Sequence, residues 1–253
     1  MASPGASTPA DEGPQDFHTG PRVVKAGGFG RVLLAWIGIF IVLQSLRWGG
    51  GIPAAELAAG IEEGASRVES RIRGEVSEEL IRKAIRDQRD ARSFWSVIGA
   101  LGDFLVEPAA LAFRAVLVAT LFTGIAALAG RTPGYDRALF ESSMAQGFWV
   151  LGLAVRLGLA AALGRGDADV ETSAVLFLPP GAHPAWLWLA LRQVELFALA
   201  GWTVMACQAA RRGDSPAWLA SALCLSLALL EALIRLSVAL VMGGAIRLSL
   251  LVE

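Results

Sequence analysis

The chain has 253 residues, of which 55% are hydrophobic and 18% are charged, and its mean hydropathy is +0.54. Soluble globular domains are about 45–50% apolar with about 25% charged residues, so this composition excludes an ordinary soluble domain. The formal net charge of -1 also excludes a strongly basic protein that would bind nucleic acid through its overall field.

The N-terminal region predicts a tail followed by a membrane anchor. Residues 1–30 form the predicted disordered tail, because the first 20 are rich in Pro, Gly, Ser and acidic residues. Residues 32–46 are apolar and form the first predicted span, with Arg47 and Trp48 placed at the headgroup level. About thirty residues precede this run, so we expect an uncleaved anchor, ended by the helix-breaking segment GGGIP.

Residues 54–92 form the only long polar insert after the first span. Apolar residues recur there every three to four positions among charged ones, which predicts an amphipathic helix or a pair of helices. We expect a solvated helix packed on the rim of a bundle, and the alternative is a helix that docks a partner or lies on the membrane surface.

The rest of the chain predicts four further spans. Pro108 divides a long apolar region into an interfacial or re-entrant helix over 94–106 and a second span over 108–128. The third, fourth and fifth spans are expected over 144–163, 184–208 and 216–243, with tight Gly- and Pro-rich turns between antiparallel neighbours. The predicted fold is therefore an all-α polytopic membrane bundle of about five helices with an amphipathic helical insert outside the membrane.

The basic residues of the short connections predict the orientation. Arg31, the 130–137 turn and the 210–216 turn all fall on one side of a five-span protein, and the acidic loop 164–173 falls on the other. Since arginine is enriched in cytoplasmic connections, we expect a cytoplasmic N-terminus and an external insert.

Charged residues inside the predicted spans form the candidate site. Four helices project arginine and glutamate into one layer of the outer half of the bilayer, where an unpartnered charge is costly. The lipid- or anion-binding candidates are Arg114, Arg156, Arg192 and Arg235, and the expected intramembrane polar network contains Glu195, Glu231, Asp103 and Glu107. Within the spans proper, four arginines face two glutamates. Two arginines therefore need backbone carbonyls, water, Asp103 or Glu107, or an anionic lipid phosphate. The alternative reading is a buried network that only sets helix packing.

No catalytic or metal-binding constellation is expected. The two histidines, His18 and His183, are far apart, and Cys207 and Cys224 lie in apolar segments where a thiol acts as a small hydrophobe. Ser142 and Ser143 lie beside Glu141 without an in-span histidine or lysine as base. We therefore predict a protein that is not an enzyme and that carries no cofactor.

Two short motifs resemble the bacterial branch of the Yip-domain (Ypt/Rab-interacting protein) family. One is a Gly-rich turn with an aromatic and a basic residue before the third span, here Gly130, Gly134, Tyr135 and Arg137. The other, in the fourth span, consists of Glu195, Phe197 and Trp202, although the family has aspartate at the position of Glu195. The resemblance implies a Yip-like transmembrane domain over 31–253, with five spans and a cytosolic N-terminus. Eukaryotic relatives act in vesicle trafficking and bind small GTPases.

These observations leave two classes of function open. The first is a non-enzymatic membrane-organising or trafficking-type adaptor with an unknown protein partner. The second is a small-solute or lipid-handling transporter or channel that uses the arginine layer. Twenty arginines against two lysines are typical of a high-GC bacterial genome, which predicts the bacterial inner membrane. The expected partners are the bilayer and an anionic lipid, and nucleic acid is not among them.

Overall fold

A computed structural model describes residues 28–72, 78–132, 134–164, 170–179 and 184–247. The described residues are helical apart from short connections and one isolated antiparallel bridge between Ser173 and Glu195, which confirms the all-α prediction for this part of the chain. The predicted tail up to residue 27, residues 165–169 of the acidic loop and both histidines lie outside the described residues.

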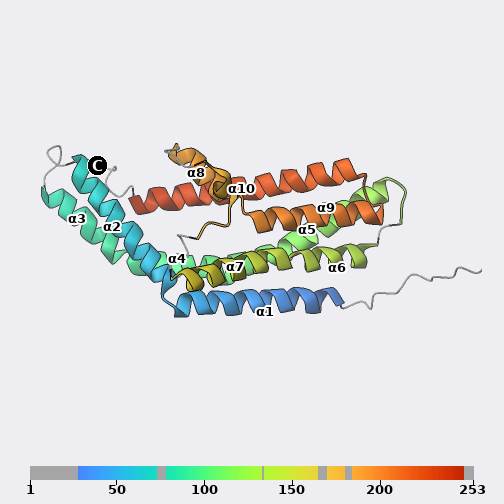
Figure 1. The fold of residues 1–253 in the computed structure, drawn as a ribbon, viewed down its shortest axis with the longest axis horizontal. Coiled ribbons are helices and arrows are strands. Elements are labelled where there is room, and N and C mark those ends of the chain that lie inside the picture. The colour runs from blue at the N-terminus through green and yellow to red at the C-terminus, as the bar shows by residue number, and fades with distance from the viewer. Residues whose placement is uncertain (1–27, 73–77, 133, 165–169, 180–183, 248–253) are drawn as a thin grey trace, which may run out of the picture.

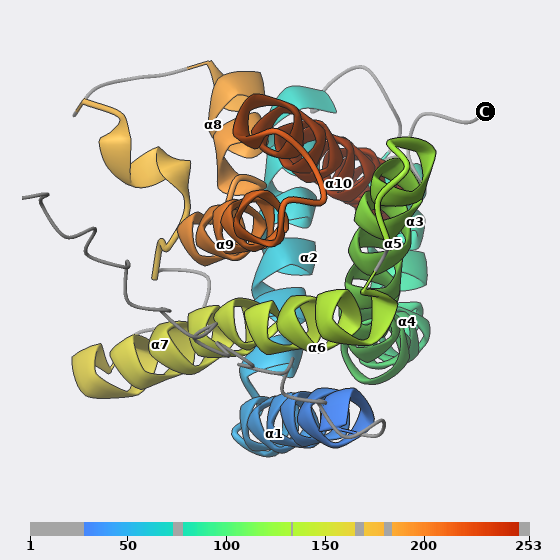
Figure 2. The same cartoon turned by 90° about the vertical axis from the view of Figure 1, so that its right-hand side faces the viewer.

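Long helices run side by side along the long axis of the molecule (Figure 1). They are α1 (Gly28–Gly49), α5 (Glu107–Leu128), α6 (Tyr135–Ala145) with α7 (Gly147–Leu163), α9 (Leu196–Arg212) and α10 (Ala217–Arg247). Seen along the bundle, α6 and α7 occupy the centre, between α1 on one side and α9 with α10 on the other (Figure 2). Four of the described helical segments are long and apolar enough to cross a membrane: 28–49, 85–128, 135–163 and 217–242.

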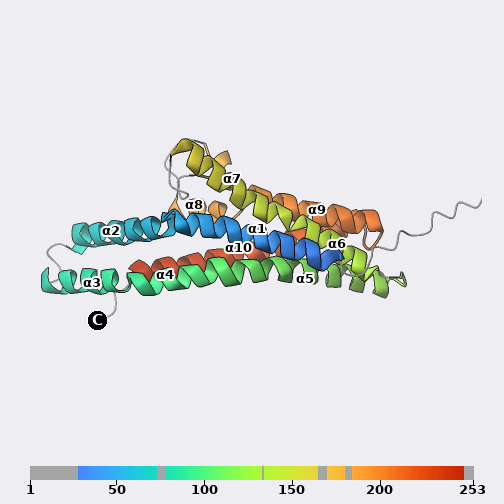
Figure 3. The same cartoon turned by 90° about the horizontal axis from the view of Figure 1, so that it is seen from below.

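A helical hairpin extends beyond one end of the bundle (Figures 1 and 3). It consists of α2 (Ile52–Ile72) and α3 (Glu78–Asp90), which occupy the predicted amphipathic insert. The break before α2 comes from Gly50 and Gly51, and Gly51 has a φ of 72°. Pro53 lies within the first turn of α2, where a missing backbone N–H costs no hydrogen bond.

The expected division of the second apolar region at Pro108 is wrong. Helix α4 (Arg92–Leu101), the π-helical turn η1 (Gly102–Val106) and α5 follow one another in a helical run that extends from Ile85 to Leu128. Pro108 is in the first turn of α5, and the N–H of Glu107 just before it bonds to the carbonyl of Gly102. The wider π turn accommodates a residue that cannot donate to the helix ladder, so the helix continues without a break.

The expected single helix over 184–208 is also wrong. Helix α8 (Ala185–Arg192) ends before Glu195, whose backbone is extended, and α9 starts at Leu196. Ala174 N donates to the carbonyl of Val194 and Leu196 N donates to that of Thr172, at 2.9 and 3.2 Å. The short 3₁₀ turn η3 (Ala174–Phe177) begins at the end of the 172–174 segment. The hydrogen bonds to this segment replace the helical ones at the break.

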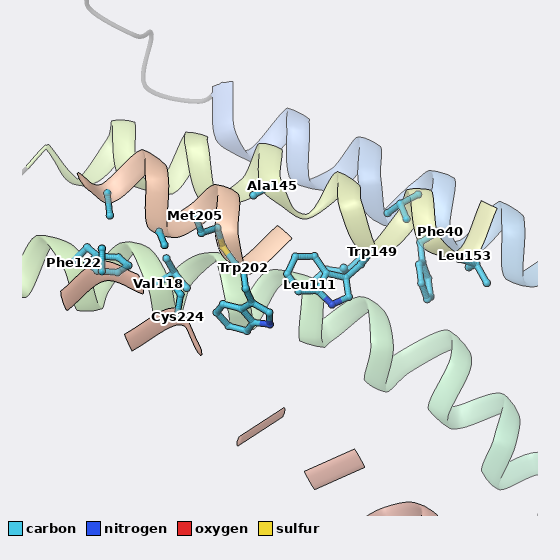
Figure 4. Packing of buried hydrophobic residues seen from close by; sticks show 14 residues of the cluster. Phe40, Leu111, Val118, Phe122, Ala145, Trp149, Leu153, Trp202, Met205 and Cys224 are labelled. Atoms are coloured by element: carbon cyan, nitrogen blue, oxygen red, sulfur yellow. The ribbon is translucent and has the colours of Figure 1, made fainter. Parts of the chain in front are cut away.

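A buried hydrophobic cluster holds α5, α7 and α9 together (Figure 4). It contains Trp149 and Trp202, whose rings meet edge to face with centroids 5.8 Å apart, and it also includes Leu111 and Met205. Large side chains on the outer faces of α1 and α10, such as Val42 and Leu233, are exposed. Apolar side chains therefore lie both in the core and on the outer surface, as expected for helices surrounded by lipid.

Candidate functional site

Two arginines and two glutamates on α5 and α10 form an ionic quartet. Arg114 lies 2.9 Å from Glu231 and 3.6 Å from Glu107. Arg235 lies 3.1 Å from both glutamates. Each arginine thus contacts both carboxylates, and the charges of the quartet cancel.

Helical spacing explains why these four side chains meet. Glu107 and Arg114 are seven residues apart on α5, two turns along one face, and Glu231 and Arg235 are one turn apart on α10. The quartet links α5 and α10 directly, whereas α5 packs mainly on α6 and α10 packs mainly on α9. The two helices also share the buried hydrophobic cluster, through Phe122 of α5 and Cys224 of α10.

Aromatic side chains enclose the inner half of the quartet. The Arg114 guanidinium lies over the ring of Trp149, 4.7 Å from its centroid, and the Trp202 indole N–H donates to Glu231 at 3.2 Å. The Arg114 side chain is only 6% exposed, and its Nη1 atom has no hydrogen-bond partner among the described residues. The Arg114 guanidinium is therefore compensated by the two carboxylates and by the indole face that cover it.

The outer half of the quartet opens into a lateral cleft of about 250 Å³ between α5 and α10. Glu107 and Arg235 are each 32% exposed there. The cleft walls are apolar and largely exposed, and they include Val106, Phe113, Leu230 and Ile234. An apolar cleft with a charged floor fits an amphiphile better than it fits a polar solute.

A second, polar cavity of about 200 Å³ lies near the break between α8 and α9. Three ion pairs line it: Arg47 with Glu56 at 3.1 Å, Arg156 with Glu195 at 3.4 Å and Arg192 with Glu171 at 3.7 Å. Arg192 also lies over the ring of Trp188, 4.8 Å from the centroid. This polar cavity joins α1, α2, α7 and the 170–173 segment around one space.

Asp103 belongs to a third group, centred on α1. It accepts from the Trp48 indole N–H at 2.8 Å, pairs with Arg47 at 3.1 Å and accepts weakly from Gln44 at 3.4 Å. Arg47 and Trp48, which are expected at the headgroup level, both pack on the carboxylate of the π turn. A lone aspartate in an apolar segment was the signal that such partners were needed.

Acidic side chains outside the predicted spans compensate the excess of arginines within them. Glu107, one of the partners expected from the sequence, pairs with Arg114 and Arg235, and Glu171, expected in the external loop, pairs with Arg192. The predicted layer is two groups rather than one, since Arg156, Arg192 and Glu195 line the polar cavity while Arg114, Arg235 and Glu231 line the cleft. Binding of an anion by these arginines stays a prediction, but an excess of positive charge no longer supports it.

The described residues include no group of three His, Cys, Asp or Glu side chains that could hold a metal ion, and Cys207 and Cys224 are free thiols. No family model, no curated protein and no solved structure matches this chain.

Proposed function

We propose that this chain is a non-enzymatic, multi-pass membrane protein that holds a membrane phospholipid in the α5–α10 cleft and so organises the bilayer around it. The observation that carries this proposal is the ionic quartet at the floor of a cleft with exposed apolar walls. In a bilayer, lipid acyl chains surround such a cleft. A lipid can therefore enter the cleft laterally, without passing through water.

The partly exposed guanidinium of Arg235 supplies the polar contact. It can donate to a phosphate or ester oxygen in the cleft, and a planar guanidinium remains charged at any physiological pH. The quartet itself is neutral, so the contact is a hydrogen bond more than a net charge attraction. Zwitterionic phospholipids then bind as readily as the anionic lipid that the sequence analysis expected.

The depth of the quartet favours the outer leaflet. The stretch from Arg114 to Leu128, the last residue of α5, rises about 21 Å, against about 30 Å of hydrocarbon. With Arg131 and Arg211 in cytoplasmic turns, the quartet lies in the outer half of the bilayer. This orientation, five crossings and a bacterial inner membrane are parts of the same proposal.

A membrane-organising or trafficking-type adaptor is the second candidate. The α2–α3 hairpin favours it, because this hairpin presents exposed charged residues such as Glu62, Arg86 and Arg89 beyond the bundle. The Yip-like motifs support the same role. A soluble protein that binds the purified full chain and no longer binds the Arg86→Glu variant would favour the adaptor.

Lipid retention tests the main proposal. Native mass spectrometry of the protein released from native-lipid nanodiscs is expected to show about one retained phospholipid per chain. Ala110→Phe fills the cleft and is expected to remove that lipid, whereas Ala109→Phe, next to it on an exposed face outside the cleft, is expected to retain it. Equal retention by both variants, with both proteins folded, would rule out the cleft as the lipid site.

A further inference from the structure

The polar cavity near the α8–α9 break is a distinct space with walls from five parts of the chain. Arg47 and Glu56 come from α1 and α2, Arg156 from α7, Glu171 from the 170–173 segment, and Arg192 from the end of α8. The cavity shares no lining residue with the α5–α10 cleft.

The fold builds one wall of this cavity by interrupting a helix. The bridge between Ser173 and Glu195 holds the Glu195 backbone in an extended conformation, and Gln193 and Glu195 both line the cavity. Irregular backbone at or near membrane depth is tolerated where it lines a polar space or is buried in protein. Broken helices of this kind build many solute sites in membrane proteins.

The cavity is lined by charges of both signs. Among the described residues, three guanidinium groups and three carboxylates line it, so neither sign is in excess there. The Arg156–Glu195 and Arg192–Glu171 distances, 3.4 and 3.7 Å, are longer than strong charge-assisted hydrogen bonds of about 2.7–2.9 Å. A ligand that carries both charges can contact an arginine and a glutamate of the cavity at the same time.

From this arrangement we infer that the polar cavity binds a compact zwitterion, with an ammonium group on the glutamates and a phosphate or carboxylate on the arginines. About 200 Å³ is smaller than the roughly 300–1,000 Å³ of drug-sized ligand sites, which limits the ligand to a few heavy atoms. Phosphoethanolamine has this chemistry, either as a free molecule or as the headgroup of a phospholipid.

Calorimetric titration of the full chain in detergent tests the inference with O-phosphoethanolamine as the probe. Saturable binding is expected, with at least tenfold weaker binding of inorganic phosphate alone and of ethanolamine alone. Arg156→Gln and Glu195→Gln are each expected to weaken O-phosphoethanolamine binding at least tenfold. Arg137→Gln, an exposed arginine at the other end of the bundle, is the matched control and should bind as the wild type does.

A lipid arm separates the two sources of the ligand. If free O-phosphoethanolamine fails to bind but phosphatidylethanolamine is retained in native mass spectra by the wild type and lost by Arg156→Gln, the ligand is the lipid headgroup. Arg192→Gln, at a side chain 38% exposed, serves if Arg156→Gln does not fold. Ala110→Phe should leave binding at this cavity unchanged, so this inference and the proposed lipid cleft fail separately.

Three results would overturn the inference. They are the absence of binding by both probes, binding that survives Arg156→Gln and Glu195→Gln unchanged, and phosphate binding as tight as that of O-phosphoethanolamine, which would indicate a simple anion site.

Discussion

Glu231 is the residue on which the ionic quartet depends. It accepts from the Trp202 indole at 3.2 Å and lies 2.9 Å from Arg114 and 3.1 Å from Arg235. Arg114 is almost fully buried and cannot lose its proton, so this carboxylate compensates most of its charge. Removal of one member of such a pair costs more than removal of both, because the remaining charge stays out of water.

We predict that Glu231→Leu lowers the free energy of unfolding by roughly 3 kcal/mol. This is the low end of the 3–5 kcal/mol seen when a buried pair loses one partner, because Glu107 remains 3.6 Å from Arg114. The double variant Arg114→Met/Glu231→Leu should cost less than Glu231→Leu alone, since Glu107 and Arg235 remain paired at 3.1 Å. Equilibrium unfolding in mixed micelles measures both.

The control for this comparison is Arg137→Gln, which breaks an exposed pair with Glu141 and should change stability by less than about 1 kcal/mol. The Arg114→Met single variant completes the comparison. If the free-energy cost of the double variant equals the sum of the costs of the two single variants, the pairing of Arg114 with Glu231 is contradicted.

At the scale of helices, α7 and α9 pack closely where Gly201 faces Trp149. A Cβ atom on Gly201 would collide with the Trp149 ring, which is itself held against Trp202 in the core. The ring is rigid and buried on both sides, so it has little room to move. Glycine allows this approach because it has no side chain.

We predict that Gly201→Ala destabilises the protein by about 1–3 kcal/mol through overpacking. Gly158→Ala, on α7 where an added Cβ meets nothing within 4 Å, should be neutral or stabilising by up to about 1 kcal/mol, because alanine favours the helix. Thermal unfolding of the two variants in the same detergent makes the comparison. A Gly201→Ala midpoint equal to that of Gly158→Ala would mean that the two helices are further apart.

The sequence predicted where most helices lie, because a run of about 20 apolar residues has few alternatives to a membrane-crossing helix. It could not predict the break at 193–195, because this segment contains neither Gly nor Pro, and its polar residues Gln193 and Glu195 are compatible with a helix that faces a bundle interior. The hydrogen bonds from the 172–174 segment that replace the helical ones are long-range contacts without a local signal. At Pro108, by contrast, the sequence predicted a break where the helix continues, since a π turn accommodates the proline.

The members of the candidate site were predictable from their cost in a bilayer, but their pairing was not. Arg192 and Glu195 could form a pair on one continuous helix, yet the helix break separates them and gives Glu195 to Arg156. The pairing of Glu171 with Arg192 could not be predicted, because a residue in a predicted loop carries no signal of its depth in the membrane. Which carboxylate meets which arginine depends on how helices are placed relative to one another, and helical periodicity does not specify that.

For the whole molecule, the number of crossings depends on α9. This helix has 17 residues, about 26 Å, and is not among the four segments that meet the length and hydropathy expected of a span. It nevertheless packs along α7 and α10, and Arg212 at its end pairs with Glu141 of α6 and with Asp214. The α9–α10 turn therefore lies at the same end of the bundle as the α5–α6 turn (Figure 1).

The side of the membrane on which Arg211 lies tests the proposed five-crossing topology, because five crossings and four crossings place this residue on opposite sides. Single cysteines at Glu62, Leu176, Arg131 and Arg211 would be introduced after Cys207 and Cys224 are replaced by alanine. Intact cells would then be treated with an impermeant thiol reagent. We predict labelling at 62 and 176 and protection at both 131 and 211 until the cells are opened. Labelling at 211 in intact cells, with 131 still protected, would remove α9 from the set of crossings and contradict the depth assigned to both candidate sites.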